Sequence, residues 1–304
     1  MKSPPTVVGI GELLWDQLPS GRQLGGAPAN FAYCSHLLGN RAVVASRVGR
    51  DRLGGDLRQA LIAREMTDQF LETDSTYPTG TVQVELSGSG QPKFVITYPA
   101  AWDFFEWSEQ WRGLAESADA LCFGSLAQRS VESRSTIQKF LDSAPQGAFR
   151  IFDVNLRQTF YSPDVIISSL THADALKLSH EELPTLGRLL GLRSLEPCLF
   201  CRELFDRFPL QLVSITRGEN GSLLIDPRGI NEHRGFSVRV RDAVGAGDAF
   251  TAGLVDEFLR GGSLAAMNDL ANRMGAWVAS CSGAMPPVPS DGLRNTLARL
   301  QMKS

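Results

Sequence analysis

The stretch RDAVGAGDAFTAGLVDEFL (residues 241–259) joins a turn of small residues to the start of a helix. The small residues Gly245, Ala246 and Gly247 leave the backbone N–H groups of the helix start open to a ligand, at the positive end of the helix dipole. Such a turn can bind a phosphate, with Asp248 beside it on the first helical turn and kept ionised by the dipole. A tight turn followed by a stabilising acid has the same local sequence, so both interpretations stay open here.

Outward from this stretch, short apolar runs alternate with segments of helical periodicity along most of the chain. Alternation of this kind favours a parallel sheet with helices on both faces, because parallel strands are buried on both sides. We therefore expect a three-layer α/β/α body with a mostly parallel central sheet. The predicted strands are 6–10, 42–49, 120–124, 149–155, 175–178 and 212–216, and the first predicted helices are 27–39 and 52–64.

Two segments, 12–23 and 79–98, alternate polar and apolar residues with period two and contain turns rich in Gly, Ser and Pro. This pattern is typical of β-hairpins. We expect a small antiparallel sheet, a lid made of about residues 12–24 and 79–102, inserted in the α/β body. Because no repeat or Pro/Gly-rich linker divides the chain, residues 1–304 are predicted to form one domain.

The composition excludes several classes of protein. A net charge of −3, with no block of Lys or Arg, gives no electrostatic footprint for nucleic acid. The apolar runs are too short to span a membrane, and the first residues do not resemble a signal peptide. Five scattered cysteines suit a reducing compartment. We therefore expect a cytoplasmic protein that binds neither nucleic acid nor a membrane.

A second cluster of small and polar residues lies in GGAPANFA (25–32). Gly25 and Gly26 allow the backbone to approach a ligand closely, and Asn30 offers a donor and an acceptor to adjacent hydroxyl groups. Upstream, GELLWD places Asp16 on the first lid strand, where its carboxylate could accept two hydroxyl hydrogen bonds. From the residues alone, Asn30 could equally be a local backbone partner, and Asp16 a solvated strand residue.

FDVNLR (152–157) ends a predicted buried strand, which is where open α/β sheets bind ligands. Asp153, Asn155 and Arg157 could reach a substrate or its phosphates there. Arg157 is the best candidate, because a guanidinium group binds phosphate oxygens in a bidentate manner. An Asx-type turn followed by a surface arginine would have the same sequence.

Two motifs carry a resemblance to a known family. DAVGAGDAF (242–250) resembles the second signature of the PfkB, or ribokinase-like, carbohydrate kinases, with Ala243 where Thr is commoner, and GGAPANFA resembles the first signature. The resemblance extends over nearly the whole chain. It implies a ribokinase-like fold and transfer of the γ-phosphoryl group of ATP, bound with Mg²⁺, to a sugar hydroxyl. The roles that it implies are Asp248 as general base, Gly245, Ala246 and Gly247 as the anion site, and Asp16, Gly25, Gly26 and Asn30 as sugar contacts.

The segment YPAAWDFF (98–105) resembles the corresponding segment of bacterial fructokinases, which favours fructose as the sugar. Trp102 or Phe104 could stack on the apolar face of a sugar ring, with Asp103 beside them. Core packing is at least as good an interpretation of these aromatic residues.

On the nucleotide side, KLSHEEL (177–183) resembles the family's Asn-x-x-Glu element, which organises the water network around Mg²⁺ and the phosphates. Glu182 matches the acidic position, and Ser179 stands where Asn is expected. The same residues make a good helix N-cap, and the two interpretations are compatible. The nucleotide contacts that the resemblance implies are Lys177, Glu182, Thr216, Gly218, Gly221, Asn272, Gly275 and Gly283.

Many relatives hold a monovalent cation beside the anion site through backbone carbonyl groups, so the resemblance also raises the hypothesis of a K⁺ site. The aligned positions are Asp242, Val244, Val278, Cys281 and Gly283. An exposed lid sheet would favour pairing with a second subunit, which makes a homodimer through the lid one expected arrangement.

Other functions remain open. A dinucleotide oxidoreductase could start with VGIGELL, but Leu14 takes the place of the third Gly of G-x-G-x-x-G, and no P-loop motif is present. A sugar-binding regulator without activity would fit the sugar side, although Asp248 and its turn are retained. Among sugar kinases, ribose, 2-keto-3-deoxygluconate and nucleosides compete with fructose as the substrate.

Overall fold

The computed structural model describes residues 3–18, 21–86 and 92–303, and its largest element is a nine-stranded sheet. The order is β13-β12-β11-β10-β9-β8-β1-β4-β5, with parallel pairing from β11 to β5 and antiparallel pairing of β12 and β13 at one edge. The strands are β1 (Thr6–Ile10), β4 (Arg41–Gly49), β5 (Leu71–Asp74), β8 (Ala120–Gly124), β9 (Phe149–Asp153), β10 (Ala175–Ser179), β11 (Leu212–Thr216), β12 (Ser222–Asp226) and β13 (Gly229–His233). The predicted mostly parallel sheet is confirmed.

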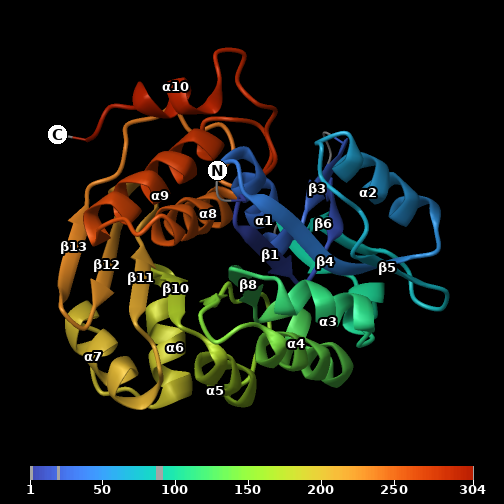
Figure 1. Ribbon diagram of the computed structural model, residues 1–304, viewed down its shortest axis with the longest axis horizontal. Coiled ribbons are helices and arrows are strands. Elements are labelled where there is room, and N and C mark those ends of the chain that lie inside the picture. Colours follow the sequence, from blue (N-terminus) through green and yellow to red (C-terminus); the bar gives the residue numbers. More distant parts are fainter. Residues whose placement is uncertain (1–2, 19–20, 87–91, 304) are drawn as a thin grey trace.

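Helices cover both faces of this sheet (Figure 1). One face carries α3 (Glu109–Glu116), α4 (Val131–Ser143), α5 (Pro163–His172), α6 (Leu183–Leu190) and α7 (Pro197–Arg207). The other carries α1 (Ala27–Leu37), α2 (Arg52–Ile62), α8 (Ala246–Leu259), α9 (Leu264–Ala279) and α10 (Leu293–Ala298). Neighbouring residues of one strand therefore enter different cores: Val7 packs on the α1 side and Val8 on the α4 side. This explains why the strands read as continuous apolar runs.

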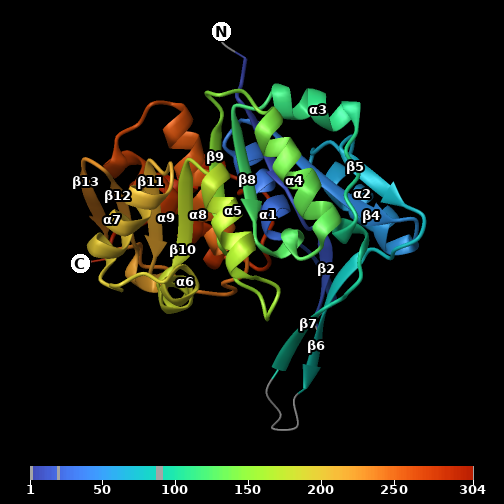
Figure 2. The ribbon, with the colours of Figure 1, turned by 90° about the horizontal axis from the view of Figure 1, so that it is seen from below.

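A second sheet has four strands in the order β3-β2-β6-β7: β2 (Leu14–Leu18), β3 (Gly21–Gly25), β6 (Gly80–Leu86) and β7 (Pro92–Ile96). Figure 2 shows β6 and β7 projecting from the body. The sheet is not wholly antiparallel as expected, because β2 and β6 pair in parallel. The chain between them passes through α1, β4, α2 and β5, and such a long connection permits parallel pairing. The predicted turns fall partly at 19–20 and 87–91, outside the described residues.

The contact between β1 and α1 sets the position of the first turn of α1. A Cβ atom at Gly9 of β1 would overlap the carbonyl oxygen of Pro28, so only glycine permits this approach of strand and helix. The start of α1 is therefore held at the carboxyl end of β1, at the same edge of the sheet as the ends of β8, β9 and β10. Among the described residues, no helix combines the length and the apolar character needed to span a membrane.

Candidate functional site

The starts of α1 and α8 meet at one point, and a side-chain hydrogen bond joins them. The Nδ2 group of Asn30 donates to Oδ2 of Asp248 at 2.8 Å, although the two residues are 218 positions apart in the sequence. Asn30 is only 3% exposed. Gly245, with φ of 77°, precedes α8 and gives this helix no side-chain cap, so its first N–H groups stay available. The two glycine-containing motifs therefore belong to one site.

A small cavity opens beside this hydrogen bond at the carboxyl ends of the parallel strands. The residues that line it are Ala27, Pro28, Phe31, Cys122, Phe123, Gly124, Asp153, Asn155 and Asp248. Most of its wall is apolar or small, and its polar groups come from the ends of β9 and the start of α8. This is the edge at which open α/β sheets place their ligands.

A buried ion pair lies behind the turn that precedes α8. Nζ of Lys177 on β10 is 3.0 Å from Oδ1 of Asp153 on β9, and both side chains are buried. A Cβ atom at Gly247 would lie 3.0 Å from the same Nζ atom, so the ammonium group sits directly against the turn. Burial disfavours the charged form of Lys177, but the nearby carboxylates Asp153, Glu182 and Asp248 outweigh burial and raise its pKa. The turn is thus backed by a fixed positive charge.

Several carboxyl groups around the cavity have a raised pKa, chiefly because of burial. The pKa of Asp16 rises to about 6 and that of Asp153 to about 6, with burial as the largest cause in both. Burial also raises the pKa of Asp248, against the lowering effects of the Asn30 hydrogen bond and of Lys177 and Arg157. Burial therefore acts on Asp248 in the opposite sense to the helix dipole, which is expected to keep this carboxyl group ionised.

Asp16 and Arg157 lie at the outer part of this site. A Cβ atom at Gly25 would overlap Oδ2 of Asp16, so the missing side chain at Gly25 makes room for the carboxylate. Arg157 is exposed, and its positive charge lowers the pKa of both Asp16 and Asp248. The structure thus brings Asp16, Gly25, Asn30, Arg157 and Asp248 into one region, while the site roles expected of them stay predictions.

The aromatic segment contains two fully buried side chains. Trp102 and Asp103 are both 0% exposed, in a 3₁₀ helix (Ala101–Asp103) at the root of the lid. Asp103 accepts hydrogen bonds from Nε and Nη2 of Arg129 at 2.7 and 2.8 Å. The guanidinium group of Arg129 also lies 4.0 Å from the centre of the Trp102 ring. Both side chains are thus enclosed around Arg129, which gives no support to a contact of Trp102 or Asp103 with a sugar, and that contact stays a prediction.

Phe104, the other aromatic candidate, stacks on Tyr77 with ring centres 3.6 Å apart. Arg129 was missed by sequence reasoning, because nothing in its neighbourhood marks it as buried. Only the fold shows that this arginine also donates to the carbonyl oxygen of Thr97 at 2.7 Å, where the chain leaves the lid.

The element His180–Glu182 is the helix cap that the sequence suggested. Oε2 of Glu182 accepts the backbone N–H of Ser179 at 2.7 Å, and Oε1 accepts that of Leu156 at 2.7 Å. Both oxygens are thus used in holding the ends of β9 and β10 together. A metal ion could reach this carboxylate only through its remaining lone pairs, which fits contact through water.

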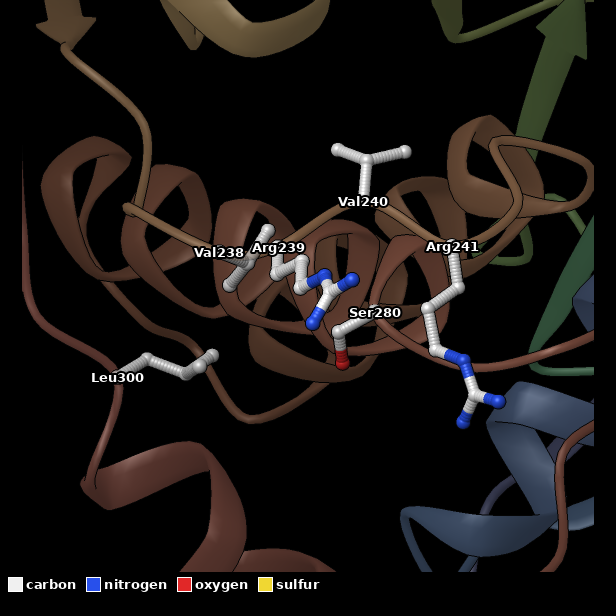
Figure 3. Close-up of a pocket in the computed structure, with 6 residues that line it drawn as sticks. All are labelled: Val238, Arg239, Val240, Arg241, Ser280 and Leu300. Carbon is white, nitrogen blue, oxygen red and sulfur yellow. The ribbon is translucent and has the colours of Figure 1, made fainter.

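A larger cavity of about 780 Å³ lies along the segment that leads to α8 (Figure 3). Its lining residues are Val238, Arg239, Val240, Arg241, Ser280 and Leu300. The guanidinium groups of Arg239 and Arg241 point to the side of Ser280, whereas Val240 points away. The backbone N–H of Arg241 donates to the carbonyl of Ala279 at 2.9 Å, so the segment follows the end of α9. None of residues 238–240 was singled out from the sequence.

Three of the residues predicted to contact the nucleotide or K⁺, Asn272, Gly275 and Asp242, make contacts within the fold near this cavity. Asn272 is buried and its Nδ2 donates to Oγ of Ser222 at 2.7 Å, so its side chain stabilises the contact of α9 with β12 and does not line the cavity. A Cβ atom at Gly275 would lie 3.1 Å from the carbonyl oxygen of Ala246, which lets α9 pack closely on the start of α8. Oδ2 of Asp242 accepts the N–H of Gly283 at 3.1 Å and ties the two loops together.

Comparison with known proteins shows that the chain is similar to carbohydrate kinases over most of its length. The family model described as pfkB family carbohydrate kinase matches residues 20–291. A fructokinase of Klebsiella pneumoniae is 30% identical over 306 residues, which cover 95% of this chain and 98% of that protein. The structure of fructokinase from Vibrio cholerae O395 in its fructose, ADP and calcium ion bound form is 28% identical, with a TM-score of 0.81 over 97% of this chain and 100% of that chain. A double mutant of fructokinase from the same organism, in its fructose, ADP and potassium ion bound form, is 28% identical, with a TM-score of 0.82 over 98% of this chain and 99% of that chain.

The buried pair of Arg129 and Asp103 gives a stability prediction. We expect Arg129→Gln to lower the free energy of unfolding by about 3–5 kcal/mol, because Asp103 is left charged and unpaired in the interior. Urea unfolding followed by tryptophan fluorescence measures the change. Arg202→Gln, at an exposed position of α7, is the matched control and should behave as wild type. Equal stability of the two variants would contradict the assigned role of the pair.

The raised carboxyl pKa values give a second prediction. Because burial raises the pKa of Glu12 to about 7, and those of Asp16 and Asp153 to about 6, the folded chain holds more protons than the unfolded chain in this range. The free energy of unfolding should therefore fall as the pH rises between about 4 and 7. Burial lowers the pKa of His233, so this one group alone makes the free energy of unfolding rise with pH, against the effect of the three acids. Thermal unfolding at pH 5.5 and pH 8 tests this, and a higher Tm at pH 8 would contradict it.

Proposed function

The chain belongs to the pfkB family of carbohydrate kinases, and from this we propose that it transfers the γ-phosphoryl group of ATP to a hydroxyl group of fructose, with Asp248 as the general base. The observation that carries the proposal is the hydrogen bond between Asn30 and Asp248. It joins the motif that suits a sugar to the turn that suits a phosphate, so one acceptor hydroxyl can lie within reach of both. The choice of fructose is supported by the named relatives.

The sugar is proposed to lie between the small sheet and the start of α1. Asp16 on β2 accepts hydrogen bonds from sugar hydroxyls, and Gly25 and Gly26 let the backbone come close. Asn30 orients the reacting hydroxyl together with Asp248. Closure of the lid over the sugar would exclude water, so that ATP is not hydrolysed in place of the transfer.

Asp248 takes the proton of the acceptor hydroxyl as the oxygen attacks the γ-phosphorus. The raised pKa that burial gives Asp248 makes its carboxylate a stronger base than a solvated aspartate. In a loose transition state the proton leaves late, so the position of the carboxylate matters more than its basicity. The hydrogen bond from Asn30 supplies that position.

The transferred group is proposed to be bound by the N–H groups of Gly245, Ala246 and Gly247. These groups lie at the start of a 14-residue helix, where the helix dipole favours negative charge. Lys177, directly behind Gly247, adds a buried positive charge. Arg157 at the mouth of the site would reach the phosphates from the opposite side.

We place the nucleoside of ATP in the cavity along 238–241, with its phosphates toward α8. Thr216 ends β11, and Gly218 and Gly221 lie in the loop from β11 to β12. Gly275 of α9 packs on the start of α8, and Gly283 in the loop after α9 donates its N–H to Asp242. The fold alone also requires glycine at position 221, because a Cβ atom there would overlap the carbonyl oxygen of His233. Asn272 is left out of this proposal because its amide is bonded to Ser222.

Two ions belong to the proposal. Mg²⁺ would neutralise phosphate charge and would be held through water by Glu182, whose two oxygens are only partly used. K⁺ would bind backbone carbonyl groups of Asp242, Val244, Val278, Cys281 and Gly283, which lie in the loop before α8, at the end of α9 and in the loop after it. Among the described residues, no group of three or more His, Cys, Asp and Glu side chains could hold a metal ion, which agrees with binding through carbonyl groups and water.

The assembly of the protein is also a proposal. Strands β3 and β7 are the edges of the small sheet, where a second copy could add through backbone hydrogen bonds. Native mass spectrometry measures whether the chain forms a dimer.

We expect Asp248→Asn to lower kcat for sugar phosphorylation by about 10²–10⁴-fold, the range usual for loss of a general base. Binding of ADP, measured by calorimetry, should persist, because the amide keeps the shape of the side chain. Asp206→Asn, at an exposed position of α7, is the control. Turnover of Asp248→Asn equal to that of the control would refute the assignment of the base.

A panel of acceptors tests the sugar. We expect a coupled ADP-release assay to give the highest kcat/KM with fructose, compared with ribose, glucose, 2-keto-3-deoxygluconate and adenosine. A higher value for ribose or for 2-keto-3-deoxygluconate would replace fructose within the same family. If the rate of ADP release does not depend on any of the sugars, or if no ADP is released, a sugar-binding regulator would be favoured.

A further inference from the structure

Glu12 lies two residues after the end of β1, against the start of α1. Its side chain is 3% exposed, and Oε1 accepts the backbone N–H of Ala27 at 3.3 Å. Its carbonyl oxygen packs against Gly26, where a Cβ atom would overlap it. Helix α1 has no side-chain cap from Gly26, and its first turn contains no acid. Glu12 therefore supplies, from outside the helix, a hydrogen-bond acceptor that the helix start lacks.

The helix start held in this way is the one that carries Asn30. The backbone N–H of Asn30 donates to the carbonyl oxygen of Gly26 at 2.9 Å, so Asn30 belongs to the first turn. Its side chain then holds Asp248 at 2.8 Å. A displacement of this turn would move the amide of Asn30, and the carboxylate of Asp248 would lose its fixed orientation. The contacts thus run without a break from Glu12 to the proposed base.

Two buried oxygen atoms in this chain of contacts have no hydrogen-bond partner among the described residues. They are Oε2 of Glu12 and Oδ1 of Asn30. A buried acceptor without a partner costs free energy, so such a group calls for a structural or functional explanation. Hydrophobic residues would fill this space at lower cost if the start of α1 served the fold alone.

We propose that Glu12 is a positioning residue for phosphoryl transfer, which fixes the first turn of α1 and thereby, through Asn30, the orientation of the Asp248 carboxylate. The proposal rests on the role proposed above for Asp248. It gives Glu12 no direct contact with the sugar or the nucleotide.

The surroundings of Glu12 add a pH dependence. The titratable and charged groups that act on it are Asp248 on α8, Arg157 after β9 and the thiol of Cys122 on β8. Burial, as the largest cause, raises the pKa of Glu12 to about 7, and Asp248 raises it further against the effects of backbone N–H groups and Arg157. Above this pH, Glu12 adds a second negative charge beside the place where the anionic phosphoryl group must arrive. We therefore expect kcat of the wild type to fall as the pH rises above 7.

The test compares the wild type with Glu12→Gln and Glu12→Ala, using the best sugar of the panel between pH 5.5 and pH 9. Glu12→Ala should lower kcat by about tenfold to a hundredfold, the effect of a small misplacement of a reacting group. The KM values for sugar and ATP should change less. Glu12→Gln, which keeps an oxygen for Ala27 but cannot ionise, should lose less activity and lack the decline above pH 7. Glu116→Gln, exposed on α3, is the control and should keep the wild-type profile.

A double-mutant cycle separates positioning from a general loss of stability. If Glu12 acts through Asn30, the variant Glu12→Ala/Asn30→Ala should have the same kcat as Asn30→Ala alone. Three results would each overturn the proposal. The first is a double variant whose loss of kcat is the product of the two single losses, and the second is a Glu12→Gln variant whose kcat still declines above pH 7. The third is a Glu12→Ala variant with a lower Tm but the wild-type kcat. If the wild type phosphorylates no sugar, or if Asp248→Asn is fully active, the proposed function fails and the role of Glu12 fails with it. If both of those tests succeed and the Glu12 variants match the control, only the role of Glu12 fails.

Discussion

The hydrogen bond between Asn30 and Asp248 is the interaction on which the organisation of the site depends. It requires the starts of α1 and α8 to meet at one edge of the sheet. The glycine contact between β1 and α1 fixes one of these starts, and the positive φ of Gly245 frees the other from a side-chain cap. The ribokinase-like body therefore holds two half-sites, distant in sequence, at the distance of a hydrogen bond.

The meeting of the two helix starts also brings several acidic side chains close together, and nearby cations offset only part of their negative charge. Asp16, Asp153 and Asp248 all have a raised pKa, because burial disfavours their ionised forms. Lys177 offsets Asp153 in the interior, and Arg157 acts on the outer carboxylates from the surface. A site of this kind reduces the stability of the folded chain, but it brings a basic carboxylate and a fixed positive charge to one small volume.

The small sheet is joined to the body by a different device. Arg129 binds the carboxylate of Asp103 and the carbonyl oxygen of Thr97, and its guanidinium group lies over Trp102 and, at 4.5 Å, over Phe160. Phe160 in turn donates its N–H to the carbonyl of Arg157. The root of the small sheet and the loop that carries Arg157 thus both contact the buried guanidinium group of Arg129, directly or through Phe160.

The sequence by itself determined the class of fold and, through two motifs that the fold brings together, the family. The continuous apolar runs required strands buried on both faces, and the small residues before Asp248 and Asn30 allowed the backbone to approach a ligand, both of which are local properties. Tertiary structure alone decided that Trp102 and Asp103 are enclosed, that Asn272 binds Ser222, that β2 and β6 run parallel, and that Glu12 lies against α1. These features depend on which distant segments touch, and burial and charge compensation arise only from that contact, so no local pattern of residues encodes them.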